Sequence, residues 1–119
     1  MQLLGLKHLT KLKRKNRGNA GLAKAIDQLI KDIAKASWKT KEEVATDRAD
    51  ADCVHSDGFY FFNMNIHRTM TLIELCTDEE ESAGTVSILW TGSHDEYERT
   101  FKNNKSTITK WLKDQGLIE

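Results

Sequence analysis

The sequence contains no proline, two cysteines and no long apolar run. Without proline, no rigid segment marks a linker between domains. Cys53 and Cys76 have neither CxxC nor Cys/His spacing, so we expect reduced thiols in a cytoplasmic protein, with a disulfide between them as the alternative. No apolar stretch approaches the ~20 residues of a membrane span, and the first residues resemble no secretory signal. We therefore expect a soluble protein with no membrane partner.

The length of 119 residues suits a single domain, 1–119, with one core. Four histidines, His8, His55, His67 and His94, are scattered through the chain. Their positions show none of the spacings that hold a zinc ion. The sequence therefore predicts neither a metal site nor a cofactor.

The net charge of zero hides a strong segregation of charge along the chain. Residues 1–41 hold 11 basic and two acidic side chains, 42–98 hold two and 14, and 99–119 hold five and two. The densest positive run consists of Lys11, Lys13, Arg14, Lys15 and Arg17. Such a run gains free energy on a phosphate backbone by releasing counterions. The alternative is a solvated helix face, because basic helices are common.

The first half of the chain is predicted to be a short strand followed by helices. Residues 2–5 suit a strand, and leucines at helical spacing predict a helix over 6–16. A second helix is predicted over 22–36, where apolar residues follow the i, i+3, i+4, i+7 pattern. Thr40 and Glu43 have capping-box spacing and predict a third, short helix that ends before the acidic stretch 47–52.

The second half of the chain has the composition of strands. Strands are predicted over 59–64, 67–76 and 85–90, with an acidic hairpin connection at 78–81. A tight turn is expected at Gly92, followed by a helix that Ser93 and Glu96 cap. A last helix is predicted over 106–115, ending at Gly116. The fold class is therefore α+β, with an antiparallel sheet of three to four strands packed with N-terminal and C-terminal helices.

Four segments, in order, resemble one protein family. They are Gly58–Met64, which contains Phe-Asn, Thr91–Tyr97, Ala36–Thr40, which contains Trp-Lys-Thr, and Met1–Leu12. Each motif is weak alone, and their joint order and spacing carry the resemblance. Taken together, the chain resembles the HigB-type toxins of type II toxin–antitoxin systems, in the RelE/ParE superfamily.

This resemblance implies a RelE-like domain and a ribosome-dependent mRNA endoribonuclease, also called an mRNA interferase. Such toxins inhibit growth by cutting messenger RNA in the ribosomal A site without a metal, through attack of a ribose 2′-OH on the adjacent phosphate. The implied partners are the ribosome, mRNA and a cognate antitoxin with a helix-turn-helix DNA-binding fold.

Arg68 and His94 are the main catalytic candidates that the resemblance indicates. Arg68 matches the family arginine, and its guanidinium would stabilise the phosphorane with a fixed fork of N–H donors. The alternative for Arg68 is an ion pair with a nearby carboxylate. His94 would transfer protons at the start of a helix, where backbone N–H groups and the helix dipole favour an anion. The alternative for His94 is an exposed first-turn residue.

Tyr97 is the third catalytic candidate, and other residues are predicted to bind RNA. Tyr97 would hold RNA by stacking or through its hydroxyl, unless it packs the helix on the sheet. Arg99 and Lys102 would bind flanking phosphates, unless they form a solvated face. RNA binding is also assigned to Lys11, Lys13 and Arg14. His67 should lie on the opposite side of its strand from Arg68, because side chains alternate in a strand.

Two departures from the family pattern leave a second function open. The segment Asn65–Arg68 is about two residues shorter than in the family and lacks its lysine, so a catalytic cation is missing. The net charge is also lower than expected for a protein that binds ribosomal RNA. The alternative function is therefore a non-catalytic protein- or RNA-binding module on the same scaffold.

Overall fold

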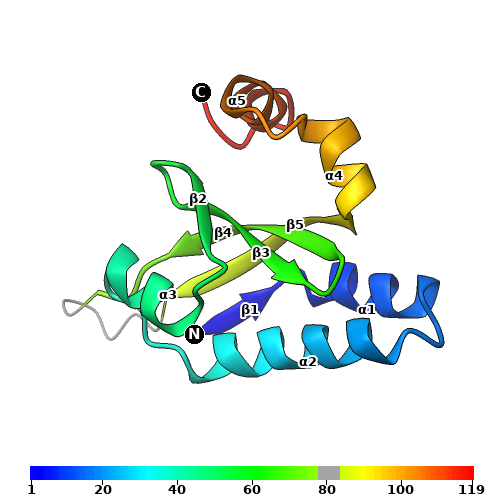
Figure 1. The fold of residues 1–119 in the computed structure, drawn as a ribbon. Helices are drawn as coiled ribbons and strands as arrows, with labels where there is room; N and C mark the ends of the chain where they lie inside the picture. Colours follow the sequence, from blue (N-terminus) through cyan, green and yellow to red (C-terminus); the bar gives the residue numbers. More distant parts are fainter. Residues whose placement is uncertain (78–83) are drawn as a thin grey trace.

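A computed structural model describes residues 1–77 and 84–119, and the expected acidic connection at 78–81 lies outside the described residues. Its elements, in chain order (Figure 1), are β1 (Gln2–Leu4), α1 (Leu6–Lys15), α2 (Ala20–Lys35), α3 (Lys41–Asp47), β2 (Asp52–His55), β3 (Phe59–Met64), β4 (His67–Glu74), β5 (Thr85–Ser93), α4 (His94–Phe101) and α5 (Lys105–Asp114).

The strands form one sheet in the order β1-β5-β4-β3-β2. This confirms the α+β class, with two corrections to the predicted antiparallel sheet of three to four strands. The described sheet has a fifth strand, β2, and β1 pairs with β5 in parallel, while the other pairs are antiparallel. The four-residue β2 escaped prediction because it lies at the sheet edge with Asp52 and Cys53 exposed, so it lacks the alternation of a buried strand.

β5 also continues further than predicted. A tight turn was expected at Gly92, but Gly92 lies within the strand and pairs with Arg68 of β4. A Cβ atom at Gly92 would come within 2.7 Å of the Trp90 ring. Glycine is therefore needed here for the close approach of an aromatic ring, and the turn expected from the sequence is absent.

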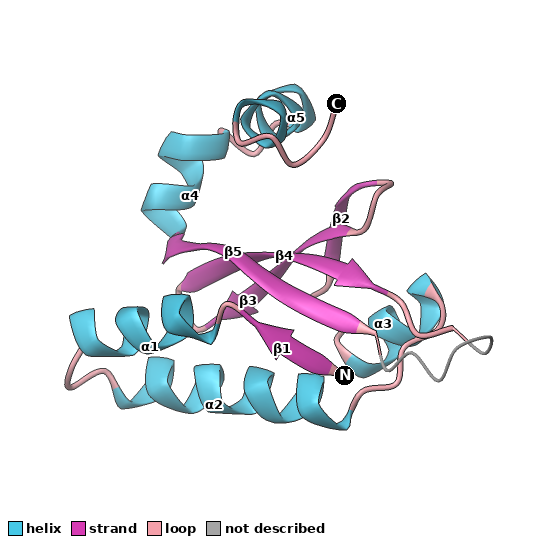
Figure 2. Cartoon of the chain, turned by 180° about the vertical axis from the view of Figure 1, so that it is seen from behind, coloured by secondary structure: helices cyan, strands magenta, loops and turns pink. Residues whose placement is uncertain are grey.

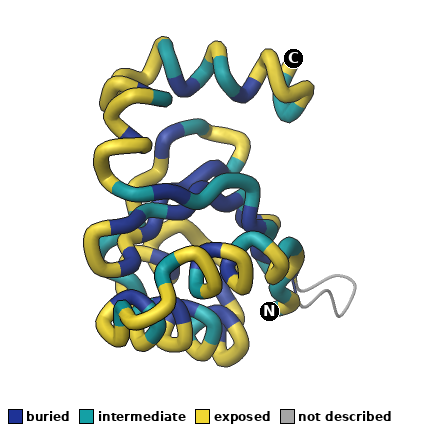
Figure 3. Tube along the Cα trace, turned by 90° about the vertical axis from the view of Figure 1, so that its right-hand side faces the viewer, coloured by how far each residue is buried: buried dark blue, intermediate teal, exposed yellow. Residues whose placement is uncertain are grey.

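Helices cover both faces of the sheet, so the sheet lies between two cores (Figure 2). α1 and α2 pack on one face with Tyr60 and Phe62, while α4 and α5 pack on the other with Phe59 and Phe61. Side chains of a strand point alternately to its two faces, so β3 supplies both cores. Figure 3 shows this arrangement as buried strands between helices whose outer surfaces are exposed.

The two-residue turn Asn65–Ile66 joins the end of β3 to the start of β4. Met64 pairs with His67 directly across this turn, and Asn65 has a φ of 63°. Asparagine tolerates this left-handed conformation, which two-residue hairpins require. The turn sets the register in which Asn63 lies opposite Arg68.

Arg48, which follows α3, connects α2 to the end of β3. Its guanidinium donates to Asp32 at 3.0 Å, to Asp50 at 2.8 Å and to the backbone carbonyl of Asn63 at 3.1 Å. It also lies 5.5 Å from the centre of the Phe62 ring. The Arg48 side chain is 13% exposed, so these contacts replace most of its hydration.

The capping and backbone features predicted for the helices are confirmed. Thr40 and Ser93 each form a complete capping box, and Gly116 has a φ of 73° just after α5.

No disulfide links Cys53 and Cys76. None of the helices in the described part is long and apolar enough to cross a membrane.

Replacing Arg48 by methionine should lower the free energy of unfolding by about 2 kcal/mol, because Asp32 and Asp50 would lose their cation. The effect should stay below the ~3–5 kcal/mol of a fully buried pair, since both carboxylates are about a quarter exposed. The free energy of unfolding is measured by urea denaturation, monitored by circular dichroism. Arg48→Lys keeps the charge and should lose less; equal losses in the two variants would contradict the role given to the carboxylates.

Candidate functional site

The best candidate site is a pocket of about 430 Å³ where the β3–β4 turn meets the start of α4. We call it the hairpin pocket, and its lining consists of Asn63, Asn65, Ile66, His67, Arg68, His94, Tyr97, Glu98 and Asn103. The structure thus brings together Arg68, His94 and Tyr97, the three residues predicted to be catalytic. They come from β4 and α4, which are distant in sequence.

The Arg68 side chain is held by four neighbours and is 15% exposed. Its guanidinium carbon lies 4.7 Å from the centre of the Tyr97 ring and 5.2 Å from that of Phe61. Its Nε donates to Oδ1 of Asn63 at 2.9 Å, and its Nη2 lies 3.6 Å from Oδ2 of Asp52. Since a guanidinium has five N–H donors, this arrangement fixes its plane and leaves donors for a ligand.

Asn63 positions Arg68, although sequence reasoning gave it no role. Its backbone N–H donates to Asp50 at 2.7 Å, its carbonyl accepts from Arg48, and its side-chain oxygen accepts from Arg68. The signal was present in the Phe-Asn motif. A two-residue turn after Met64 places Asn63 directly opposite Arg68, so the pairing could have been deduced from the hairpin register.

His94 is the first residue of α4, and its side chain is 61% exposed. Its Nε2 lies 3.6 Å from Oε1 of Glu98, one turn further along the helix. Its backbone N–H donates to the carbonyl of Ile66 at 2.8 Å, which attaches α4 to the tip of the hairpin. The imidazole therefore stands at the open rim of the pocket, beside a carboxylate that would orient it.

The helix start is a poorer anion site than the sequence predicted. The His94 N–H is bonded to Ile66, and the Glu96 N–H donates to the Ser93 hydroxyl at 3.1 Å. The Ser93 N–H in turn donates to the Glu96 carboxylate at 2.9 Å. Because these amides are already paired, an anion in the pocket would depend on side chains more than on the end of the helix.

Tyr97 packs α4 on the sheet, which is the alternative to substrate binding that the sequence analysis gave for this residue. It is 2% exposed, and Arg68 and Phe61 cover its ring. A base could stack on this ring only by displacing Arg68. The Tyr97 hydroxyl donates to Oδ1 of Asn103 at 2.9 Å. Burial raises the pKa of this hydroxyl, against the opposing charge of Arg68, so it keeps its proton at neutral pH.

The other predicted RNA contacts lie outside the hairpin pocket. Arg99 and Lys102 are exposed at the end of α4 and do not line it. On α1, Lys13 forms an ion pair with Asp27 at 2.7 Å. Lys11 lines a different groove, between α1 and β5, and Arg14 is exposed.

The charge of the hairpin pocket is modest. Of the described residues that line it, none is a lysine, Arg68 is a permanent cation and Glu98 is an acid. Asp52, which approaches Arg68, adds a second carboxylate nearby. The turn Asn65–Ile66 itself carries no charged side chain. In the described part of the chain, no three His, Cys, Asp or Glu side chains gather as metal ligands would.

Comparison with known proteins identifies the family. No curated protein is significantly similar to the chain. A family model described as the RelE-like toxic component of a toxin–antitoxin system matches residues 22–100. The match covers about two thirds of the chain and includes Arg68, His94 and Tyr97. The protein therefore belongs to the HigB toxin family, the RelE-like toxic components of toxin–antitoxin systems.

Proposed function

We propose that the protein is an endoribonuclease that cuts messenger RNA on the ribosome and is neutralised by a helix-turn-helix antitoxin. One observation supports this most. The hairpin pocket holds an immobilised guanidinium, Arg68, and an accessible imidazole, His94, in a single cavity. Phosphodiester cleavage without a metal needs these two kinds of group, a fixed positive charge and a proton carrier.

In the proposed reaction the ribose 2′-OH attacks the adjacent phosphorus atom. The 2′-OH gives its proton to solvent water as the O2′–P bond forms and the P–O5′ bond breaks. The leaving 5′-oxygen takes a proton from His94, which gives a 2′,3′-cyclic phosphate and a 5′-hydroxyl. Negative charge gathers on the equatorial oxygens of the pentavalent phosphorane. Arg68 is suited to stabilise this charge, because Asn63, Phe61 and Tyr97 hold its plane in place before the substrate arrives.

His94 is suited to carry a proton in this reaction. Its ring reaches the pocket rim and is 61% exposed, so a substrate can approach it. Glu98 lies 3.6 Å from Nε2 and would orient the ring, which can donate a proton to the leaving 5′-oxygen. Tyr97 and Asn103 supply neutral polar groups at the base of the same pocket.

A non-catalytic binding module remains the second candidate, and the acidic surroundings of Arg68 favour it. Asp52 and Glu98 lie close to the two proposed catalytic side chains, and no lysine among the described residues lines the pocket. A module of this kind would bind a partner without cutting RNA. Cleavage by the purified protein in a translation system separates the two functions.

Arg68→Ala should lower the rate of mRNA cleavage by about 10²–10³-fold, since it removes the main charge that faces the phosphorane. Arg68→Lys keeps the charge but loses the fork, so it should retain part of the rate. The rates are measured by primer extension on mRNA in a reconstituted translation system, with and without ribosomes. Thermal unfolding confirms that each variant is folded. A folded Arg68→Ala protein with an unchanged rate would refute this role.

His94→Gln should slow cleavage by about 10²-fold or more without changing stability, because the side chain is exposed and its role is proton transfer. The control is His55→Gln in β2, a histidine that does not line the hairpin pocket. Induced expression in a bacterium provides a second measurement, in which wild type arrests growth and His94→Gln does not. Arrest of equal strength in both would exclude His94 as the proton carrier.

A further inference from the structure

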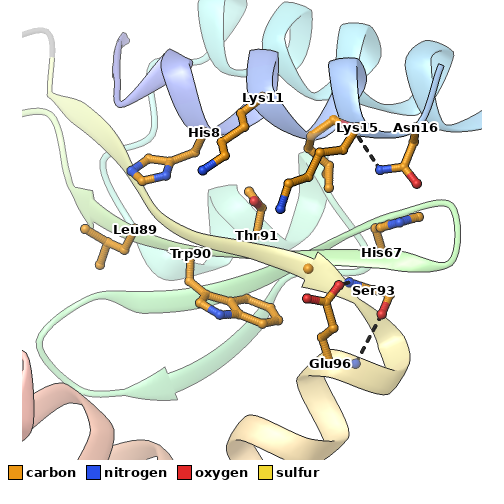
Figure 4. Close-up of a pocket in the computed structure, with 12 residues that line it drawn as sticks. His8, Lys11, Lys15, Asn16, His67, Leu89, Trp90, Thr91, Ser93 and Glu96 are labelled. Atoms are coloured by element: carbon orange, nitrogen blue, oxygen red, sulfur yellow. Dashed lines mark hydrogen bonds between the residues drawn. The ribbon is translucent and has the colours of Figure 1, made fainter.

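A second groove of about 430 Å³ lies between α1 and β5. We call it the α1–β5 groove. Its wall on α1 carries the nitrogen-bearing side chains of His8, Lys11 and Lys15. Figure 4 shows both lysines extending from α1 toward β5, with Trp90 and Glu96 on the opposite side of that strand. A groove with one cationic wall is suited to an anionic ligand.

The floor of this groove is an unpaired edge of the sheet. β1 pairs with β5 only over Thr85–Ser87. In the described part of the chain, the rest of β5 therefore pairs with one strand, β4. The Trp90 carbonyl accepts from the Thr69 hydroxyl of β4 at 2.9 Å and therefore faces β4. Backbone groups alternate in direction along a strand, so the N–H and C=O of Thr91 face the groove.

His67 connects the α1–β5 groove to the hairpin pocket, because it lines both. The residue is 6% exposed, and its Nδ1 has no hydrogen-bond partner among the described residues. Burial lowers the pKa of its imidazole, against the opposing charge of Glu96. A buried polar atom is normally paired, so this position favours a ligand that brings a hydrogen-bonding group.

We propose that the α1–β5 groove binds a second phosphate of the RNA strand whose scissile phosphate lies in the hairpin pocket. This inference rests on the proposed function and adds a phosphate subsite to it. Lys11 and Lys15 supply the charge, and the Thr91 N–H supplies a neutral donor. His67, shared by the two cavities, lies where the strand would pass from one to the other.

Glu96 is the one acid among the described lining residues, and its carboxylate is already engaged. It accepts the Ser93 N–H, which lowers the pKa of the Glu96 carboxyl, with a further contribution from Lys15. Its charge still opposes an anion. Glu96→Gln retains an acceptor for the Ser93 N–H, because glutamine also completes a capping box. This substitution should therefore tighten phosphate binding while the helix start remains intact.

The test measures binding of a 2′-O-methyl hexaribonucleotide, which cannot be cut by 2′-OH attack, by fluorescence anisotropy over a range of salt concentrations. Lys11→Gln with Lys15→Gln should weaken binding roughly tenfold at low salt. The slope of log K against log salt should fall in magnitude by about 0.7, the value for one phosphate contact on a single strand. A 2′-O-methyl dinucleotide, with one phosphate, should bind the variant and wild type alike.

The matched control is Lys31→Gln with Lys35→Gln, which removes the same charge from exposed positions of α2 outside the groove. It should leave the hexanucleotide affinity and slope close to wild type. Equal losses in the two double variants, or an effect of Glu96→Gln in the wrong direction, would overturn the subsite. A third result would also overturn the subsite: groove variants that bind the hexanucleotide normally but no longer bind an acidic peptide able to pair as a strand.

These outcomes separate the subsite from the function on which it rests. If Arg68→Ala weakens binding of both oligonucleotides but the α1 variant does not, the groove proposal fails and the proposed function stands. If wild type binds the hexanucleotide no better than the dinucleotide, the groove proposal also fails. If Arg68→Ala leaves cleavage unchanged, the proposed function fails whatever the groove binds.

Discussion

The arrangement of the hairpin pocket depends on how Arg68 is held. Its guanidinium lies against the rings of Phe61 and Tyr97, and Asn63 accepts its Nε hydrogen. Cation–π contacts and a charge-assisted hydrogen bond each stabilise a buried guanidinium. Asp50 and Arg48 bind the backbone of Asn63. Contacts that begin at α2 and the segment after α3 therefore determine the direction of one side chain in the pocket.

The position of His94 follows from the same hairpin. The bond from its backbone N–H to the Ile66 carbonyl places α4 against the tip of the β3–β4 turn. The two-residue turn thus has two structural roles: it sets Asn63 opposite Arg68, and it provides the carbonyl that locates α4. No lysine among the described residues lines the hairpin pocket, so its positive charge is low.

Much of this could be predicted from local sequence signals. The capping residues Thr40 and Ser93 marked the starts of α3 and α4, and hydrophobic periodicity located α1 and α2. The structure also brings the two main catalytic candidates, Arg68 and His94, into one cavity. Features set by tertiary contact did not follow from local patterns. The covered ring of Tyr97 and the bond from the His94 amide to Ile66 both depend on segments remote in sequence. The strand β2 pairs with its neighbour in sequence, β3, and was missed because Asp52 and Cys53 are exposed at the sheet edge.

The most direct test of the account is the position of the scissile phosphate in a crystal structure of the protein with a 2′-O-methyl RNA, on the ribosome or alone. The account predicts a non-bridging oxygen of that phosphate within hydrogen-bond distance of the Arg68 guanidinium, with the His94 ring on the side of the leaving 5′-oxygen. A phosphate bound elsewhere, with Arg68 still directed at Asp52 and Asn63 alone, would contradict it.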